Sequence, residues 1–388
     1  MPDMDKYNLR IISAVLFVPL FIEAFTVFRH GPDSIFTGLV YMGVLTLSLF
    51  KIRGQIRGGD LCILVAIYAF ITLNIILYPS TVEYYQTVVM CLSMIFYVPV
   101  GCFVVRHVKN WNNLFVEIKP FAVGSVFLGI YIVFFGDVGF GDEYFNYMEF
   151  SYSILPFVAA LYVIARRERK LKILWFTLFF IGSLCMVIYG ARASTLFLLL
   201  YIVFLEFYNG TSKSKIYILV FFLLVTVVII IFFDNIILYL NGIDGLKDSR
   251  LIAKAVAGQL SDGGERDILI DDSIKRISSM DLDIPGIFGD RAYIRGIYPH
   301  NIILEILMQF GLFLGAGLLI FLLYVIYIDI KKTEFTLPSA YFCCVLFGRF
   351  FFSGSYIQDG SFWLWLFCMF SIFKYRHFGR INKPICKY

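Results

Sequence analysis

Residues 173–207 read ILWFTLFFIGSLCMVIYGARASTLFLLLYIVFLEF, and this stretch decides the class of the fold. It contains two long apolar runs, and its only charged residues are Arg192 and Glu206. A helix needs about 20 predominantly apolar residues to cross the hydrocarbon core of a bilayer. Each run approaches that length, and only residues 190–193 separate them. The stretch therefore predicts two membrane-spanning helices joined by a very short turn.

The rest of the chain repeats this pattern. Of its 388 residues, 60% are hydrophobic and 16% are charged, whereas soluble domains are about 45–50% apolar and about 25% charged. These values exclude a soluble secreted, disulfide-framed or nucleic-acid-binding protein. The apolar runs are continuous and do not alternate with polar residues, which also excludes a transmembrane β-barrel.

Counting the runs predicts an all-α polytopic membrane protein, a single transmembrane domain over residues 1–388 with about 12 spans. The runs lie at about 11–28, 34–50, 61–78, 86–105, 120–135, 151–165, 172–189, 194–208, 216–233, 302–328, 337–353 and 361–373.

The basic residues predict the orientation of these spans. If the N-terminus is cytoplasmic and the spans alternate, most of the 33 Lys and Arg residues fall on the cytoplasmic side. They lie in the segments 6–10, 51–57, 106–119, 166–172, 213–215, 331–332 and 374–387. The short outer loops hold only Arg29, Arg192 and Arg349. This alternation follows the positive-inside rule and places both termini in the cytoplasm.

One large outer loop, residues 234–300 between the ninth and tenth spans, carries most of the remaining basic residues. Two short helices are expected in it, at 249–258 and 265–280, the second with an apolar stripe of Ile270, Ile274 and Ile277. Arg266 falls in the first turn of the second helix, where a positive charge opposes the helix dipole. Helix stability therefore does not account for Arg266, but an anionic ligand would.

Five arginines are expected at this outer face: Arg192, Arg266, Arg291, Arg295 and Arg349. Guanidinium groups bind phosphate through paired hydrogen bonds. An anionic headgroup whose tail lies in the membrane, such as a lipid-linked diphosphate, is therefore the predicted ligand. A structural alternative exists for Arg192 and Arg349, which lie near span ends and can extend to lipid headgroups.

Glu305 is an acidic residue inside a predicted span, five residues after His300. The spacing puts Glu305 on a different helix face from His300 and on the same face as Asn301. Two roles remain open for Glu305, a buried ion pair that orients Arg or His groups and a structural contact between helices.

No metal or organic cofactor is expected. The eight cysteines and four histidines show no metal-ligand spacing or disulfide framework. The pattern Asp281-Leu282-Asp283 can hold a divalent ion on a sugar nucleotide, but two acids in a polar loop are common by chance.

Three motifs resemble the O-antigen polymerase and O-antigen ligase superfamily of bacterial inner-membrane glycosyltransferases. Residues 190–194 are similar to its Ser-Arg-Gly turn, with Ala191 and Ala193 in place of Ser and Gly. Residues 263–266 and 285–289 are similar to the Gly-Arg helix and Gly-x-Gly turn of its periplasmic loop. The third motif is His300-Asn301, then nine intervening residues, then Gly311.

The resemblance implies polymerisation of undecaprenyl-diphosphate-linked oligosaccharide repeat units at the periplasmic face of the inner membrane. It implies a multi-pass, metal-independent glycosyltransferase whose arginines bind the diphosphate. His300 is then the candidate base or the group that positions the diphosphate, with Glu305 or Asp267 as its substitute. Arg266 and Glu305 are also counted as catalytic. The resemblance also implies a chain-length regulator of the same pathway as a partner, and no nucleic acid.

Three alternatives stay open at this point. An O-antigen ligase would transfer finished polymer to lipid A–core, but the ligase pattern expects a small residue or Tyr at the position of Leu314. A transporter or flippase would be expected to show paired halves or a charged pathway, and the sequence has no internal repeat. A non-catalytic scaffold would leave the arginines unexplained.

Overall fold

The computed structural model describes residues 2–85, 93–136, 145–189, 191–209, 265–280, 283–294, 296–332 and 337–378, with 216, 239 and 242. Every regular element in this part of the chain is helical. Five of its helices are long and apolar enough to cross a bilayer. They are α1 (Pro2–Arg29), α2 (Ser34–Ile52), α3 (Gly58–Leu77), α9 (Tyr147–Arg167) and α15 (Ile302–Lys332).

The shorter elements lie mostly where the sequence predicts further spans. They are α4 (Val82–Tyr85), α6 (Val98–Phe103), α7 (Leu114–Glu117), α8 (Lys119–Phe135), α10 (Lys172–Tyr189), α11 (Arg192–Asn209), α14 (Glu265–Ser279), α16 (Leu337–Phe342) and α17 (Gly360–Phe378), with η1 (Pro79–Thr81), η2 (Ser93–Tyr97), η3 (Val105–His107), η4 (Trp111–Asn113), η5 (Cys343–Phe347) and η6 (Gly348–Phe351). The count of about twelve spans and their sidedness stay predictions. The run at 216–233 and the predicted helix at 249–258 lie outside the described residues, except for Ile216.

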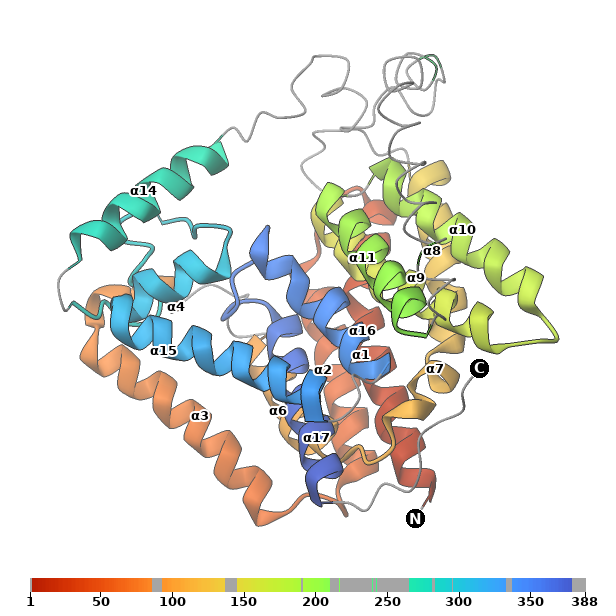
Figure 1. Ribbon diagram of the computed structural model, residues 1–388, viewed down its shortest axis with the longest axis horizontal. Helices are drawn as coiled ribbons and strands as arrows, with labels where there is room; N and C mark the ends of the chain where they lie inside the picture. The colour runs from red at the N-terminus through yellow and green to blue at the C-terminus, as the bar shows by residue number, and fades with distance from the viewer. Residues whose placement is uncertain are drawn as a thin grey trace. The chain divides into compact units, whose positions relative to one another are not determined.

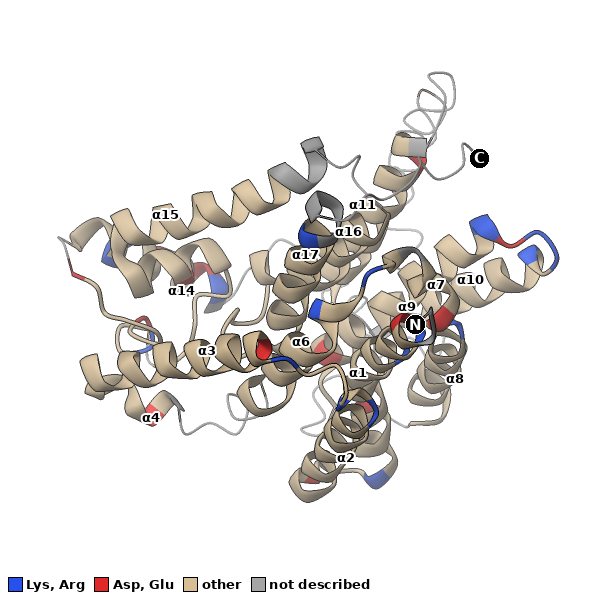
Figure 2. Cartoon of the chain, turned by 90° about the horizontal axis from the view of Figure 1, so that it is seen from below, with Lys and Arg blue, Asp and Glu red and all other residues tan. Residues whose placement is uncertain are grey.

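The surfaces of α2 and α3 identify a membrane protein. Leu47 is 68% exposed on α2, and Val65 and Ile76 are 63% and 68% exposed on α3. Large apolar side chains exposed along a whole helix are unfavourable in water and favourable against lipid. Figure 2 shows charged residues mainly near helix ends and in connections, while most helical surface carries none. The chain is therefore an all-helical membrane protein in the part described.

The chain divides into two compact units, which are considered separately. The first comprises residues 1–12, 38–112 and 263–381, and the second residues 13–37, 113–262 and 382–388. In the second unit, α9 is the central helix and packs against α8, α10 and α11. Residues 150–161 of α9 are all buried, which is why this helix has apolar or small side chains all round.

In the first unit, α17 is the central helix. It packs against α6, η2, η3 and η5, and its Trp365 stacks on Phe347 with ring centroids 4.1 Å apart. The helix α3 packs against α6. The helix α14 packs against α15, which Figure 1 also shows.

The contact between α14 and α15 corrects one prediction. The buried face of α14 contains Leu269 and Ser273, with Ile277 packed beside them, and meets Met308 of α15. Ile274, expected in the apolar stripe, is 49% exposed. Residues 269, 273 and 277 are spaced by four and share a helix face. The prediction that Ile274 belongs to the packed stripe was wrong, because the small side chain of Ser273 occupies the centre of the packed face.

A sharp break divides α15 at Gly311, whose φ is +71° and ψ is 173°. A Cβ on Gly315 would lie 3.0 Å from the carbonyl oxygen of Ile306, whereas nine residues of straight helix would separate them by about 13 Å. The two arms, residues 302–310 and 312–332, therefore fold back on each other. The second arm alone has the roughly 20 residues of a span.

Replacing Gly311 by alanine should destabilise this hairpin. The new Cβ would lie 2.8 Å from the carbonyl oxygen of Asp283, and the positive φ is strained for any residue with a Cβ. We expect a loss of about 1–3 kcal/mol, seen as a lower melting temperature in detergent. Gly317→Ala is the matched control on the same helix, because nothing lies within 4 Å of its Cβ position. Equal melting temperatures for both variants would contradict the break as a structural requirement.

Candidate functional site

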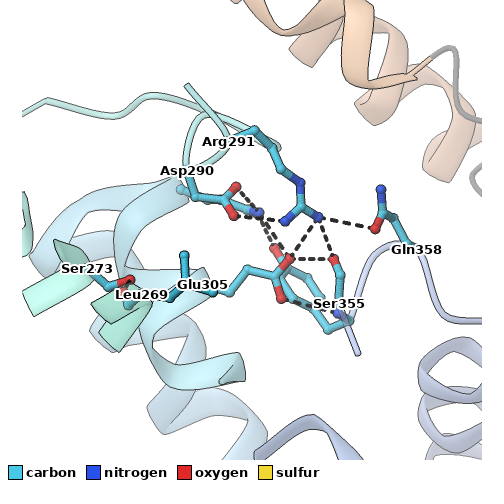
Figure 3. A network of polar contacts seen from close by, with 9 residues as sticks. Leu269, Ser273, Asp290, Arg291, Glu305, Ser355 and Gln358 are labelled. Carbon is cyan, nitrogen blue, oxygen red and sulfur yellow. Dashed lines mark hydrogen bonds and ion pairs between the residues drawn. The ribbon is translucent and has the colours of Figure 1, made fainter. Parts of the chain in front are cut away.

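Three segments of the first unit meet in one polar site (Figure 3). They are the loop 283–301, the first arm of α15, and the connection from η6 to α17. The loop runs directly into α15, whereas Ser355 of the connection is 50 residues from Glu305 in sequence. Their polar side chains point toward one another.

The loop is held in place through its backbone. Gly286 has φ +82°, and its N–H donates to the carbonyl oxygen of Gln309 at 2.8 Å. A Cβ at this glycine would lie 2.2 Å from the ring of Tyr78, so no other residue fits without movement. The Asn74 side chain of α3 accepts from the N–H of Ile287 at 3.0 Å and donates to its carbonyl oxygen at 3.5 Å. The loop is thus attached to both α3 and α15.

Arg291 lies at the centre of the site and is 2% exposed. Its Nη1 lies 3.4 Å from Oδ2 of Asp290. Its Nη2 donates to Oγ of Ser355 at 3.1 Å and to Oε1 of Gln358 at 3.2 Å, and lies 3.6 Å from Oε1 of Glu305. Both terminal nitrogens of the guanidinium are therefore engaged by the protein. We call Arg291 and these four partners the arginine clasp.

The two carboxyl groups of the clasp are fully buried and receive hydrogen bonds. Asp290 accepts from Nε2 of Gln309 at 2.7 Å. Glu305 accepts from the Ser355 hydroxyl and from the N–H of Tyr356, the latter at 3.3 Å. Burial raises the pKa of Asp290, against the opposing effect of Arg291. One guanidinium faces two carboxyl groups, so a proton retained on Asp290 would leave the clasp electrically neutral.

His300 ends the loop and is adjacent to the clasp. Its φ is +54°, a left-handed conformation that a histidine adopts at some cost in energy. Its ring lies 4.2 Å from that of Tyr298, and the guanidinium of Arg291 lies 4.9 Å from the centroid of the Tyr298 ring. Burial, followed by the positive charges of Arg266 and Arg291, lowers the pKa of His300 to about 4. The imidazole is therefore neutral at physiological pH. Its buried Nδ1 has no hydrogen-bond partner in the described part of the chain.

Arg266, in the first turn of α14, is partly exposed and close enough to His300 to affect its protonation. Among the described residues it forms no ion pair that would neutralise its charge. Its charge is available to an external anion. Asp267, next to it, is exposed.

Arg349 lies on η6 and its Nη1 forms an ion pair with Oδ2 of Asp359 at 2.9 Å. The other carboxylate oxygen of Asp359 accepts from the N–H of Ser361 at 2.9 Å, which caps the start of α17. Both Arg349 and Arg291 affect the protonation of Tyr298, whose pKa is raised mainly by burial. The Arg349–Asp359 pair therefore lies beside the clasp and ties η6 to α17.

The structure thus brings together Arg266, Arg291, His300 and Glu305, and places Arg349 near them. Of the two roles left open for Glu305, the structure shows a buried ion pair, with Arg291. The guanidinium of Arg291 already contacts two carboxyl groups, an amide and a hydroxyl, so a direct diphosphate contact would require the clasp to open. This arrangement argues against Arg291 as a diphosphate ligand and assigns it the role of a structural centre.

The side chains of the other predicted site residues lie outside the part that the structure describes. The first residue of α11 is Arg192, in the second unit, and its side chain is outside the described part. Arg295 and Asp281 are also outside it. Within the described residues, no group of three His, Cys, Asp or Glu side chains could hold a metal ion.

The sequence analysis missed the uncharged members of the site. Gln309 and Asn74 lie within apolar runs and are buried, and each holds the loop by two contacts. A buried amide in a membrane span is costly unless it is hydrogen-bonded. A search for amides, and not for ionisable residues alone, would have identified both. Tyr356 and Gln358 lie in a polar connection, where the sequence provides no comparable signal.

Comparison with protein-family models, with curated proteins and with solved structures finds no match to this chain.

The protonation of His300 can be measured directly. With only four histidines in the chain, selective isotope labelling and a His300→Gln variant assign its NMR signals. We expect its pKa near 4, so that the ring stays neutral from about pH 5 upward. Arg266→Gln should raise this pKa, because it removes a nearby positive charge. An ordinary histidine pKa in the wild type would contradict the buried environment.

Replacing Arg291 by methionine should destabilise the first unit strongly. Removal leaves Asp290 and Glu305 buried without their cation, which typically costs about 3–5 kcal/mol. Arg276→Met is a control: this arginine stacks on Tyr293 with its guanidinium 3.7 Å from the ring centroid, near the surface. Loss of Arg276 should lower the free energy of unfolding clearly less than loss of Arg291. Similar melting temperatures for the two variants would show that the clasp is not a major source of stability.

Proposed function

We propose that this chain is a polysaccharide polymerase that joins lipid-linked oligosaccharide repeat units at the outer face of the bacterial inner membrane. The observation that carries the proposal is the neutral His300 next to the partly exposed Arg266, at the end of a loop fixed by the arginine clasp. The resemblance to O-antigen polymerases supplies the substrate, an undecaprenyl-diphosphate-linked oligosaccharide.

The chemistry requires two groups. The bond between the donor sugar and its diphosphate breaks, and the diphosphate leaves with negative charge that Arg266 can stabilise. The acceptor hydroxyl forms the new glycosidic bond and gives up a proton, which a neutral imidazole can accept. Arg266 and His300 are the residues proposed for these roles.

The low pKa of His300 in the free protein is consistent with a base that becomes stronger when the substrate binds. A base with a pKa near 4 is unprotonated at neutral pH but accepts protons weakly. A bound diphosphate would offset the charges of Arg266 and Arg291, which contribute to that low pKa. Binding of the substrate would thus make His300 a stronger base when the acceptor is present.

The clasp has a positioning role in this proposal. Glu305 contacts Arg291 and Ser355, whereas His300 contacts Tyr298. We therefore place Glu305 among the groups that hold the loop, in preference to a direct role as base.

Loss of the gene tests the function through the surface polysaccharide on a gel. A polymerase predicts that the ladder of chain lengths is lost while a single-repeat band remains. Loss of every repeat, with full-length polymer accumulating on undecaprenyl diphosphate, would indicate the ligase instead. Loss of every repeat without that polymer would indicate a flippase. An unchanged ladder would refute all three.

Point variants test the site in the same assay. We expect Arg266→Ala and His300→Ala each to lower polymerisation about 100-fold or more, as is typical for loss of electrostatic or general-base catalysis. Arg276→Ala is the matched control, because it removes an arginine ten residues further along the same helix, about 15 Å from Arg266. Protein levels are compared by immunoblot. A full ladder from either site variant at normal level would exclude that residue from the chemistry.

A further inference from the structure

Tyr298 lies between the arginine clasp and His300 and is half-buried. The centroid of its ring is 4.2 Å from that of His300 and 4.9 Å from the guanidinium carbon of Arg291. Both contacts are made by the ring, so a phenylalanine at this position could make them equally well. The packing therefore accounts for an aromatic ring at position 298 but not for its hydroxyl.

The hydroxyl of Tyr298 forms no hydrogen bond with another residue that the structure describes. Two other tyrosines of the first unit differ in this respect. The Tyr356 hydroxyl donates to Oε1 of Gln309 at 2.7 Å. The Tyr293 hydroxyl accepts from Nη2 of Arg276 at 2.6 Å. Because a tyrosine hydroxyl in a partly buried position normally has a hydrogen-bond partner, we expect a polar group of a ligand to contact Tyr298.

The charges around the Tyr298 hydroxyl balance one another. Two arginines and two acids lie within electrostatic range of it. Arg291 lies 3.6 Å from Glu305. Arg349 lies 2.9 Å from Asp359. A phosphate is bound best where arginines have charge to spare, whereas a neutral hydroxyl has no such requirement. These surroundings therefore suit a sugar hydroxyl better than a phosphate.

His300 offers a second contact to the same ligand. Its Nδ1 is buried, so Nε2 is the ring nitrogen that a substrate can reach. Burial raises the pKa of Tyr298, so its hydroxyl stays protonated at neutral pH and can both donate and accept a hydrogen bond. With the two rings in contact, one sugar can reach both side chains.

We propose that Tyr298 binds the acceptor sugar of the lipid-linked repeat unit, and that its hydroxyl holds that sugar beside Nε2 of His300. This inference rests on the proposed function and adds to it the place of the acceptor. The diphosphate remains assigned to Arg266. A fixed hydrogen bond to the acceptor favours the reaction because it keeps the reacting hydroxyl close to its base.

Lipid binding to the full chain in detergent, measured by native mass spectrometry, tests the proposal without requiring turnover. The two probes are undecaprenyl diphosphate and the lipid-linked single repeat unit extracted from a strain that lacks this gene. We expect the wild type to bind the repeat unit more tightly than the lipid without sugar. Tyr298→Phe should bind the repeat unit about three- to tenfold more weakly, as for loss of one neutral hydrogen bond, and undecaprenyl diphosphate as the wild type does.

Tyr293→Phe is the matched control, because it removes a tyrosine hydroxyl from the same loop and should bind both lipids as the wild type does. The melting temperature of Tyr298→Phe and the pKa of its His300 should stay close to those of the wild type, since the ring remains. If Tyr298→Phe does not fold, 4-aminophenylalanine and 4-methoxyphenylalanine at position 298 replace it in the comparison. The amino group can donate a hydrogen bond and the methoxy group cannot, so the second should bind the repeat unit more weakly.

Three results would overturn the proposal. The wild type could bind both lipids equally, or Tyr298→Phe could bind the repeat unit as tightly as the wild type does. Weaker binding of undecaprenyl diphosphate to Tyr298→Phe would show that the hydroxyl contacts the diphosphate instead of the sugar. An unchanged polysaccharide ladder in the strain that lacks the gene would refute the polymerase, whereas a sugar-dependent loss of binding in Tyr298→Phe would still establish the sugar contact.

Discussion

The ionic contact of Arg291 with Asp290 and Glu305 is the interaction on which the candidate site of the first unit depends. Charges buried in an apolar surrounding are tolerated only when they are paired and fully hydrogen-bonded. The guanidinium meets this condition by joining the loop, the first arm of α15 and the connection to α17. Because none of the three can move without leaving a buried charge unpaired, they are fixed relative to one another.

This constraint explains how an ordinary loop can hold a histidine in an unfavourable conformation. His300 adopts a left-handed φ directly before α15, and Asn301 caps that helix by accepting from the N–H groups of Ile303 and Leu304 at 2.9 and 3.3 Å. The Asn301 side chain also donates to the carbonyl oxygen of Phe351 at 3.3 Å. The Asn301 cap and the arginine clasp fix the backbone on both sides of His300. These neighbouring contacts, and not those of the His300 side chain, maintain its strained backbone conformation.

The class of the fold was predictable from sequence because the bilayer imposes length and hydropathy on every span. The convergence of Arg266, Arg291, His300 and Glu305 was predictable in outline, since all four lie in or beside one long hydrophilic loop. The breaking of α15 was not. Gly311 stands in a continuous apolar run, and glycine is common in straight membrane helices. Only the backbone dihedral angles of Gly311 and the approach of Gly315 to Ile306 show that this glycine reverses the chain.

The role of Arg291 could not be predicted from sequence for a related reason. Arg266 and Arg291 are equally plausible phosphate ligands when they are counted as loop arginines. Arg291 differs from Arg266 because two carboxyl groups lie within contact distance of its guanidinium. One belongs to Asp290, the preceding residue, and the other to Glu305, 14 residues later in α15. Whether an arginine binds a ligand or holds the fold thus depends on whether tertiary structure has already neutralised it.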